Sequence, residues 1–150
     1  MLSPFILFMK KNKFIYDRVL TYLQKNRDYG NSVDKTRLLI GADADLVRMA
    51  DKIHRIENLM MTNDAKVAES IEDTIFDLIN YMAIYQSGEG HDCIETLSSP
   101  LRLMDFISEV QDIVSQPEVE FKNLQTKLTK EILSDFTMKY IVDYIQVCVA

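Results

Sequence analysis

The segment 43–85 constrains the fold most, because its pattern is that of two amphipathic helices joined by a short turn. In the second half, polar and apolar side chains separate onto two faces at about 100° per residue. The polar face comprises Glu69, Asp73, Asp77 and Asn80, and the apolar face comprises Val67, Ile71, Ile75, Leu78 and Met82. Carboxylates four residues apart repel by roughly 0.2–0.5 kcal/mol per pair, and no lysine or arginine lies between positions 69 and 81. We therefore expect a partner outside this helix to neutralise the acidic stripe.

The first half of the segment carries a mainly basic stripe. It is formed at helical spacing by Arg48, Asp51, Lys52 and Arg55. Helices joined by a turn as short as 62–64 usually lie antiparallel. The basic and acidic stripes are therefore expected to face one cleft.

Composition favours an all-α fold. The chain of 150 residues is long enough for one domain with its own core, and its 47% apolar and 27% charged residues are typical of globular proteins. Four glycines and three prolines are few for the many tight turns of an all-β protein. We predict a single helical domain over 1–150, in which 25–85 forms the site and 93–150 adds helices for packing or oligomerisation.

Charge and cysteine usage narrow the function classes. A net charge of −6 argues against general nucleic-acid binding, which needs clustered lysine and arginine. Cys93 and Cys148 supply neither a disulfide framework nor a zinc-ligand spacing, so a reducing cytoplasm is the simpler location. The apolar run 4–9 is too short to cross a bilayer, and we expect no membrane span.

Helix start and stop signals divide the rest of the chain. Ser3 and Pro4 predict a first helix that ends at about Gln24, and a loop follows. A short helix is expected over 34–40, ended by Gly41, with longer helices over 43–61 and 64–86. Further helices are expected from Pro100 and, after a break at Pro117, over about 121–147.

The loop after the first helix contains Tyr29 and Asn31. An aromatic ring and a side-chain amide can stack on a nucleobase and hydrogen-bond to it, which suits the mouth of a cleft. The alternative is that Gly30 and Asn31 only end a helix or form a turn.

Three separated motifs carry a resemblance. They are Lys25-Asn-Arg-Asp-Tyr-Gly-Asn-Ser, Arg48-Met-Ala-Asp-Lys-Ile-His-Arg-Ile-Glu-Asn-Leu and Glu69-Ser-Ile-Glu-Asp-Thr-Ile-Phe-Asp-Leu-Ile-Asn-Tyr. In this order they resemble the small phage and bacterial domain called nucleotide modification associated domain 1. That domain is similar to the MazG-like all-α nucleoside triphosphate pyrophosphohydrolases. The resemblance implies a helical bundle whose cleft holds Mg²⁺, with Mn²⁺ as an alternative ion, and cleaves a (deoxy)nucleoside triphosphate to monophosphate and pyrophosphate.

The resemblance also implies residue roles. The catalytic carboxylates would be Glu69, Asp73 and Asp77, and these residues with Asp51 would be the metal ligands. Substrate would be bound by Tyr29, Asn31, Arg48, Lys52, Arg55 and Asn80. Arginine suits the triphosphate because its fork can make two hydrogen bonds at once.

The chain departs from the MazG-like pattern, which has Glu-Glu-x-x-Glu on the first helix and Glu-x-x-Asp on the second. Here the first helix offers Asp51 alone, and Thr74 stands three residues before Asp77. Pyrophosphohydrolysis and nucleotide binding without cleavage therefore both stay open, so we leave undecided whether the chain is an enzyme.

Two further alternatives concern structure and partners. The stripes would form a purely structural salt-bridge network if Arg48 or Arg55 paired with Asp73 or Asp77. The C-terminal helices would then carry the function by docking a host or phage protein. These helices have more aromatic residues than one narrow apolar stripe can bury, so a monomer would expose some of them. An exposed apolar patch is typical of an interface, and we therefore expect a homo-oligomer.

Overall fold

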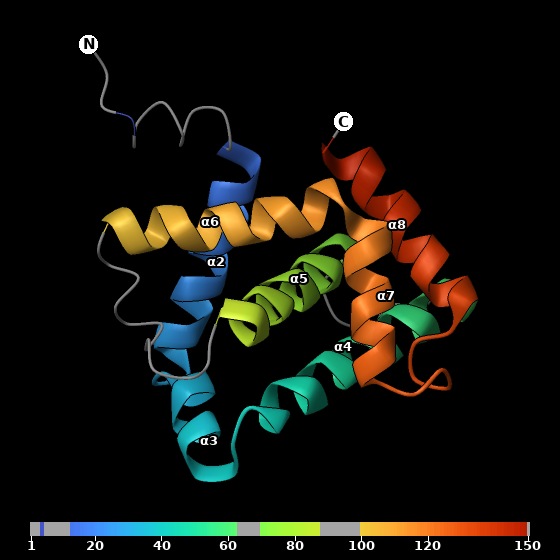
Figure 1. The fold of residues 1–150 in the computed structure, drawn as a ribbon, viewed down its shortest axis with the longest axis horizontal. Helices are drawn as coiled ribbons and strands as arrows, with labels where there is room; N and C mark the ends of the chain where they lie inside the picture. Colours follow the sequence, from blue (N-terminus) through green and yellow to red (C-terminus); the bar gives the residue numbers. More distant parts are fainter. Residues whose placement is uncertain (1–3, 5–12, 63–69, 88–99, 150) are drawn as a thin grey trace.

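The computed structural model describes residues 4, 13–62, 70–87 and 100–149, and their regular structure is entirely helical (Figure 1). In chain order the helices are α2 (Lys13–Asp28), α3 (Ser32–Ile40), α4 (Asp43–Thr62), α5 (Ile71–Ser87), α6 (Pro100–Ser115), α7 (Pro117–Lys127) and α8 (Asp135–Val149). The predicted all-α fold is confirmed. Within the described ranges, no helix combines the length and the apolar composition that crossing a bilayer requires.

Helix α5 forms the centre of the bundle, and α2, α4, α6 and α8 all pack against it (Figure 1). Most of its apolar side chains are buried and form one core with apolar side chains of the surrounding helices; the largest buried ones are Met49, Ile53, Ile56, Ile75, Phe76, Leu78, Ile79, Ile107, Ile113, Phe121 and Ile141. One stripe of α5 stays partly open and includes Asp73, Asp77 and Tyr81, which recur every four residues. The fold thus presents Asp73, Asp77 and Tyr81 of its central helix at one place on the surface.

The predicted helix boundaries agree closely for the short helix and for α4. Gly41 ends α3 with a φ of 101°, and its N–H donates to the carbonyl of Arg37 at 2.8 Å. Glycine suits this position because a side chain would be strained at positive φ. The predicted start of the second long helix at about 64 lies outside the described residues, as does most of 3–12. Ser70 is not helical, and α5 begins at Ile71. The first helix was predicted to end at about Gln24, but α2 continues for another turn to Asp28.

The single last helix predicted over 121–147 is wrong. The structure divides it into α7 and α8, because a connection at 128–134 turns the chain. Ser134 Oγ accepts the N–H of Thr137 at 3.2 Å and so caps the start of α8. Gln125 fastens the connection to α7 by donating to the carbonyl of Leu133 at 2.8 Å. Leu133 is fully buried, so the turn itself belongs to the core.

The C-terminal helices leave some apolar side chains exposed. Phe121 and Ile141 are fully buried, whereas Phe136 is 69% exposed. Tyr140 and Tyr144 are partly buried, with ring centroids 6.0 Å apart. The homo-oligomer expected from this region stays a prediction.

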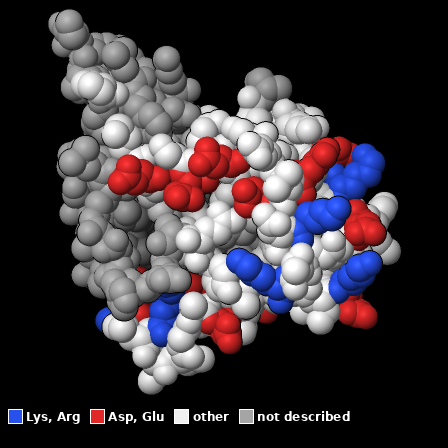
Figure 2. All heavy atoms as spheres, viewed as in Figure 1, with Lys and Arg blue, Asp and Glu red and all other residues white. Residues whose placement is uncertain are grey.

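A row of carboxylates follows α6 on one face of the bundle. Figure 2 shows carboxylates in a row where α6 crosses that face. Burial, followed by the charges of Asp112, Glu120 and Asp105, raises the pKa of Glu109. Like charges along this row disfavour the binding of phosphate groups to α6.

Candidate functional site

A pocket of about 600 Å³ opens beside the partly exposed stripe of α5. Helices α2, α3, α4 and α5 and the turn between α2 and α3 all contribute to its walls. It is lined by Tyr22, Lys25, Asn26, Asp28, Tyr29, Ser32, Val33, Arg48, Lys52, Asp73, Asp77 and Tyr81. The pocket therefore combines aromatic rings, cations and carboxylates.

Asp77 lies between two lysines from different helices. Lys52 Nζ of α4 is 3.2 Å from Asp77 Oδ2, and Lys25 Nζ of α2 is 3.6 Å from Asp77 Oδ1. The Asp77 side chain is only 13% exposed, so these contacts are partly shielded from water. They supply, from outside α5, the positive charge that the acidic stripe requires.

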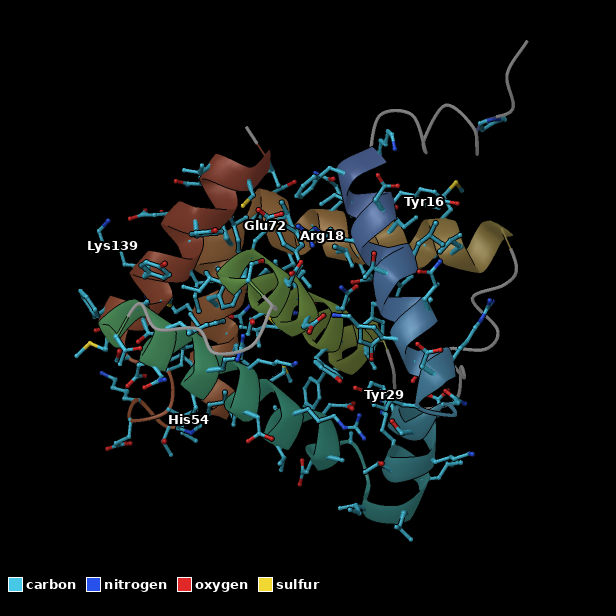
Figure 3. The ribbon with its side chains drawn as sticks, turned by 180° about the vertical axis from the view of Figure 1, so that it is seen from behind. Tyr16, Arg18, Tyr29, His54, Glu72 and Lys139 are labelled. Carbon is cyan, nitrogen blue, oxygen red and sulfur yellow. The ribbon has the colours of Figure 1, made fainter. Side chains whose placement is uncertain are left out.

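Arg18 of α2 binds both carboxylates in the first turn of α5 (Figure 3). Its Nη1 lies 2.5 Å from Asp73 Oδ1, and its Nη2 donates to Glu72 Oε1. Partial burial alone would raise the pKa of Asp73, but hydrogen bonds, first of all from Arg18, outweigh burial and hold the pKa below its ordinary value of 3.8. Asp73 is consequently ionised near neutral pH.

Arg48 is fixed at the junction of α3 and α4. Its Nη2 donates to Thr36 Oγ1 at 2.9 Å and to the carbonyl of Ser32 at 3.4 Å. The guanidinium carbon also lies 6.0 Å from the centroid of the Tyr81 ring. These contacts hold a permanent positive charge at the pocket wall.

The end of the pocket formed by α2 and α3 is more aromatic. The rings of Tyr22 and Tyr81 meet edge to face, with centroids 5.5 Å apart. Burial, and then the neighbouring Tyr81, raises the pKa of Tyr22 well above its ordinary value of 10.0, so the hydroxyl keeps its proton. Tyr29 is 73% exposed near the turn between α2 and α3 (Figure 3).

The structure brings together part of the predicted site. Of the residues selected from the sequence, those that line the pocket are Tyr29, Arg48, Lys52, Asp73 and Asp77. The ion pairs seen there use Arg18, Lys25 and Lys52 as the cations. The sequence alternative of a salt-bridge network had instead named the two arginines of α4.

Four other predicted residues do not line this pocket. Asn31 is buried behind it, and Asp51 is exposed on α4. Arg55 donates from Nε to a threonine hydroxyl of α5 at 3.0 Å. Asn80 is 1% exposed in the core and donates to the backbone carbonyl one turn earlier at 2.8 Å.

Sequence reasoning missed several pocket residues on α2. Ending the first helix at about Gln24 placed Lys25 and Asn26 in a loop, so their helical register was not considered. Extending the period by one turn puts Tyr22, Asn26 and Tyr29 on neighbouring positions of one face. That extension was the signal available in the sequence.

The described carboxylates suit a Mg²⁺ ion shared with a phosphorylated ligand. Asp73 and Asp77 lie one turn apart on the pocket wall, and Mg²⁺ commonly takes one or two carboxylates while phosphate oxygens and water supply the rest. In the parts of the chain that the structure describes, no group of three or more His, Cys, Asp or Glu could hold a metal. Glu69, the remaining predicted ligand, lies outside those parts.

A buried ion pair supports the junction that holds Arg48. Asp45 is fully buried in the first turn of α4, with Oδ2 2.9 Å from Arg37 Nε. Burial raises the pKa of Asp45 to about 6, against the opposing charges of Arg37 and Arg48. The folded protein therefore binds this proton more tightly than the unfolded chain does.

A pH-dependent loss of stability follows. The stabilisation from Asp45 is fully present below the unfolded pKa near 3.8 and is lost as the pH rises through about 6. Relative to Asp45→Asn, the wild-type free energy of unfolding should fall by about 2–3 kcal/mol between pH 4 and pH 7. Urea denaturation of both proteins across this range measures the difference, and parallel curves would refute the assignment.

The comparison with known families covers the pocket. Residues 25–85 match the family model described as Nucleotide modification associated domain 1. The match spans the end of α2, α3, α4 and most of α5, and it includes every pocket residue except Tyr22. No curated protein and no solved structure matches the chain.

Proposed function

We propose that the pocket binds a (deoxy)nucleoside triphosphate together with Mg²⁺. The observation that carries this proposal is the meeting of tyrosine rings, cations and carboxylates in one pocket of about 600 Å³. The same residues lie almost entirely in the segment that matches a family named for nucleotide modification. The tyrosine rings suit the base, the cations suit the phosphates, and the carboxylates suit the metal.

The order of residues along α5 supports a direction for the ligand. Asp73, Asp77 and Tyr81 recur every four residues, so the stripe extends for about 12 Å along the helix. Lys25 and Lys52 surround Asp77 and suit the phosphates. The Tyr81 end, which contains further rings, suits the base.

The pocket residues have distinct roles in this proposal. Arg48 is held by α3 beside the Tyr81 ring, so its planar fork suits the phosphate nearest the base. Lys25 and Lys52 exchange part of their contact with Asp77 for contact with the phosphates. When bound, Mg²⁺ would neutralise phosphate charge and activate a water for attack at phosphorus. Arg18 holds the Asp73 carboxylate in place, and the lowered pKa of Asp73 keeps it negatively charged. Asp73 is therefore better suited to holding the metal cation than to accepting a proton.

The proposed reaction is cleavage to the monophosphate and pyrophosphate. The second candidate is binding of the nucleotide without cleavage. The observation that favours it is that Asp73 and Asp77 already hold cationic side chains within the protein. Product analysis separates the two candidates, because only the first releases pyrophosphate.

The test is a thermal-shift panel of nucleotides with and without Mg²⁺. A ligand at one hundred times its Kd should add about 2.7 kcal/mol to the free energy of unfolding. Because the metal is shared with the phosphates, Mg²⁺ alone should give little shift and the nucleotide with Mg²⁺ a large one. The absence of a shift with every nucleotide would refute the proposal and favour a protein partner of the C-terminal helices.

A further inference from the structure

One buried polar atom of the pocket, Asn26 Oδ1, has no hydrogen-bond partner among the described residues. Asn26 lies on α2, lines the pocket and is 5% exposed. A buried polar atom without a partner costs stability, so such atoms in a binding pocket are positions where a ligand can complete the hydrogen bonds.

Asn31 fixes which atom of the Asn26 amide is free. Asn31 adopts a left-handed conformation with φ of 59°, and its N–H donates to the carbonyl of Asn26 at 2.9 Å. Its Oδ1 accepts a hydrogen bond from Asn26 Nδ2, also at 2.9 Å. The amide group of Asn26 is thereby held from behind, and its carbonyl oxygen is the atom left for the ligand.

We propose that Asn26 reads the nucleobase by accepting a hydrogen bond from an N–H on its edge. Asn31 is the positioning residue. This inference rests on the proposed function. A phosphate cannot be the group recognised by Asn26 Oδ1, because an ionised phosphate offers no donor. The neighbouring Tyr81 ring and Val33 provide the apolar surroundings that a flat base requires.

The test compares bases that keep or lack the donor. The probes are the four deoxynucleoside triphosphates and, for each, an analogue whose edge N–H groups are methylated or removed, titrated calorimetrically with Mg²⁺. For the base that binds best, removal of the donor should weaken binding to the wild type about 10- to 100-fold. Asn26→Ala should bind that base and its analogue with equal affinity.

Asn31 supplies a matched pair of variants. Asn31→Gly keeps the left-handed turn but removes the acceptor for Asn26 Nδ2, so discrimination should fall. Asn31→Asp keeps a side-chain acceptor and should retain discrimination. Inorganic tripolyphosphate, which has no base, should bind both variants and Asn26→Ala as it binds the wild type. If Asn26→Ala loses tripolyphosphate binding because its fold is damaged, the comparison of Asn31→Gly with Asn31→Asp tests the proposal in its place.

The outcomes separate this inference from the proposed function. Equal binding of parent and analogue nucleotides by the wild type would overturn the role of Asn26 and leave nucleotide binding intact. A different result would place the contact on the sugar: the wild type would bind the 2′,3′-dideoxy nucleotide more weakly than the deoxy nucleotide, and Asn26→Ala would bind the two equally. That result would overturn the assignment to the base. Failure of the wild type to bind any nucleotide would overturn both proposals.

Discussion

Replacing Asp77 with asparagine is expected to abolish most of the stabilisation that a nucleoside triphosphate confers in the presence of Mg²⁺. The carboxylate lies at the middle of the pocket stripe, 13% exposed, and would contribute one of the few protein ligands to the metal. Asparagine keeps the size but loses the charge. Binding of the nucleotide with Mg²⁺ should weaken about 10- to 100-fold, because a charge-assisted contact is lost.

The same change tests how far the lysines depend on Asp77. Lys25 and Lys52 lose a shared anion, but their side chains are 44% and 25% exposed, so solvent screens the effect. The free energy of unfolding of the unliganded protein should therefore fall by about 1 kcal/mol or less.

A matched control is Asp51→Asn, which removes the same charge from an exposed position of α4 outside the pocket. Thermal shift with and without nucleotide and Mg²⁺ measures both proteins. The control should respond like the wild type. If Asp77→Asn also keeps the full nucleotide and Mg²⁺ response, Asp77 is a structural ion-pair residue and the proposed metal role is wrong.

Helices α4 and α5 at the centre of the site were predictable, because the spacing of residues within each segment is enough to indicate a helix and its faces. The spacing of Asp73 and Asp77 places them on one face of α5, and Gly41 ends α3 where its positive φ allows. The residues that cover this face could not be predicted in the same way. Arg18 lies 55 positions before Asp73, and periodicity states which face is polar without stating which helix packs on it.

Two errors arose where local signals conflicted. Leu124, Leu128 and Ile132 continue the apolar helical period across 128–134, so the turn between α7 and α8 was hidden. Ser134 is the cap that reveals it, yet serine is common enough that its role depends on the tertiary turn. On α2 the opposite error occurred, because a cluster of polar residues near Asn26 resembled a loop although the helix continued.

Replacing Arg18 with alanine is expected to cause the largest loss of stability among the polar substitutions considered. The guanidinium binds Glu72 and Asp73 and lies 5.5 and 5.4 Å from the ring centroids of Phe14 and Phe76. The arginine side chain is 22% exposed, and the carboxylates are about one-third exposed. Allowing for this solvent screening, the free energy of unfolding should fall by about 2–3 kcal/mol at neutral pH.

The pH dependence of this loss identifies its cause. The lowered pKa of Asp73 means that its ion pair stabilises the fold above the unfolded pKa near 3.8 and that this stabilisation disappears as the pH falls through the folded value. The difference between wild type and Arg18→Ala should therefore shrink in acid, and the residual difference reports packing against the two rings. Lys13→Ala, which breaks an exposed pair with Asp17, should change stability little at any pH. Urea denaturation at neutral and acid pH measures all three proteins, and a loss for Arg18→Ala that does not vary with pH would show that ring packing, not the carboxylate pairing, fixes the start of α5.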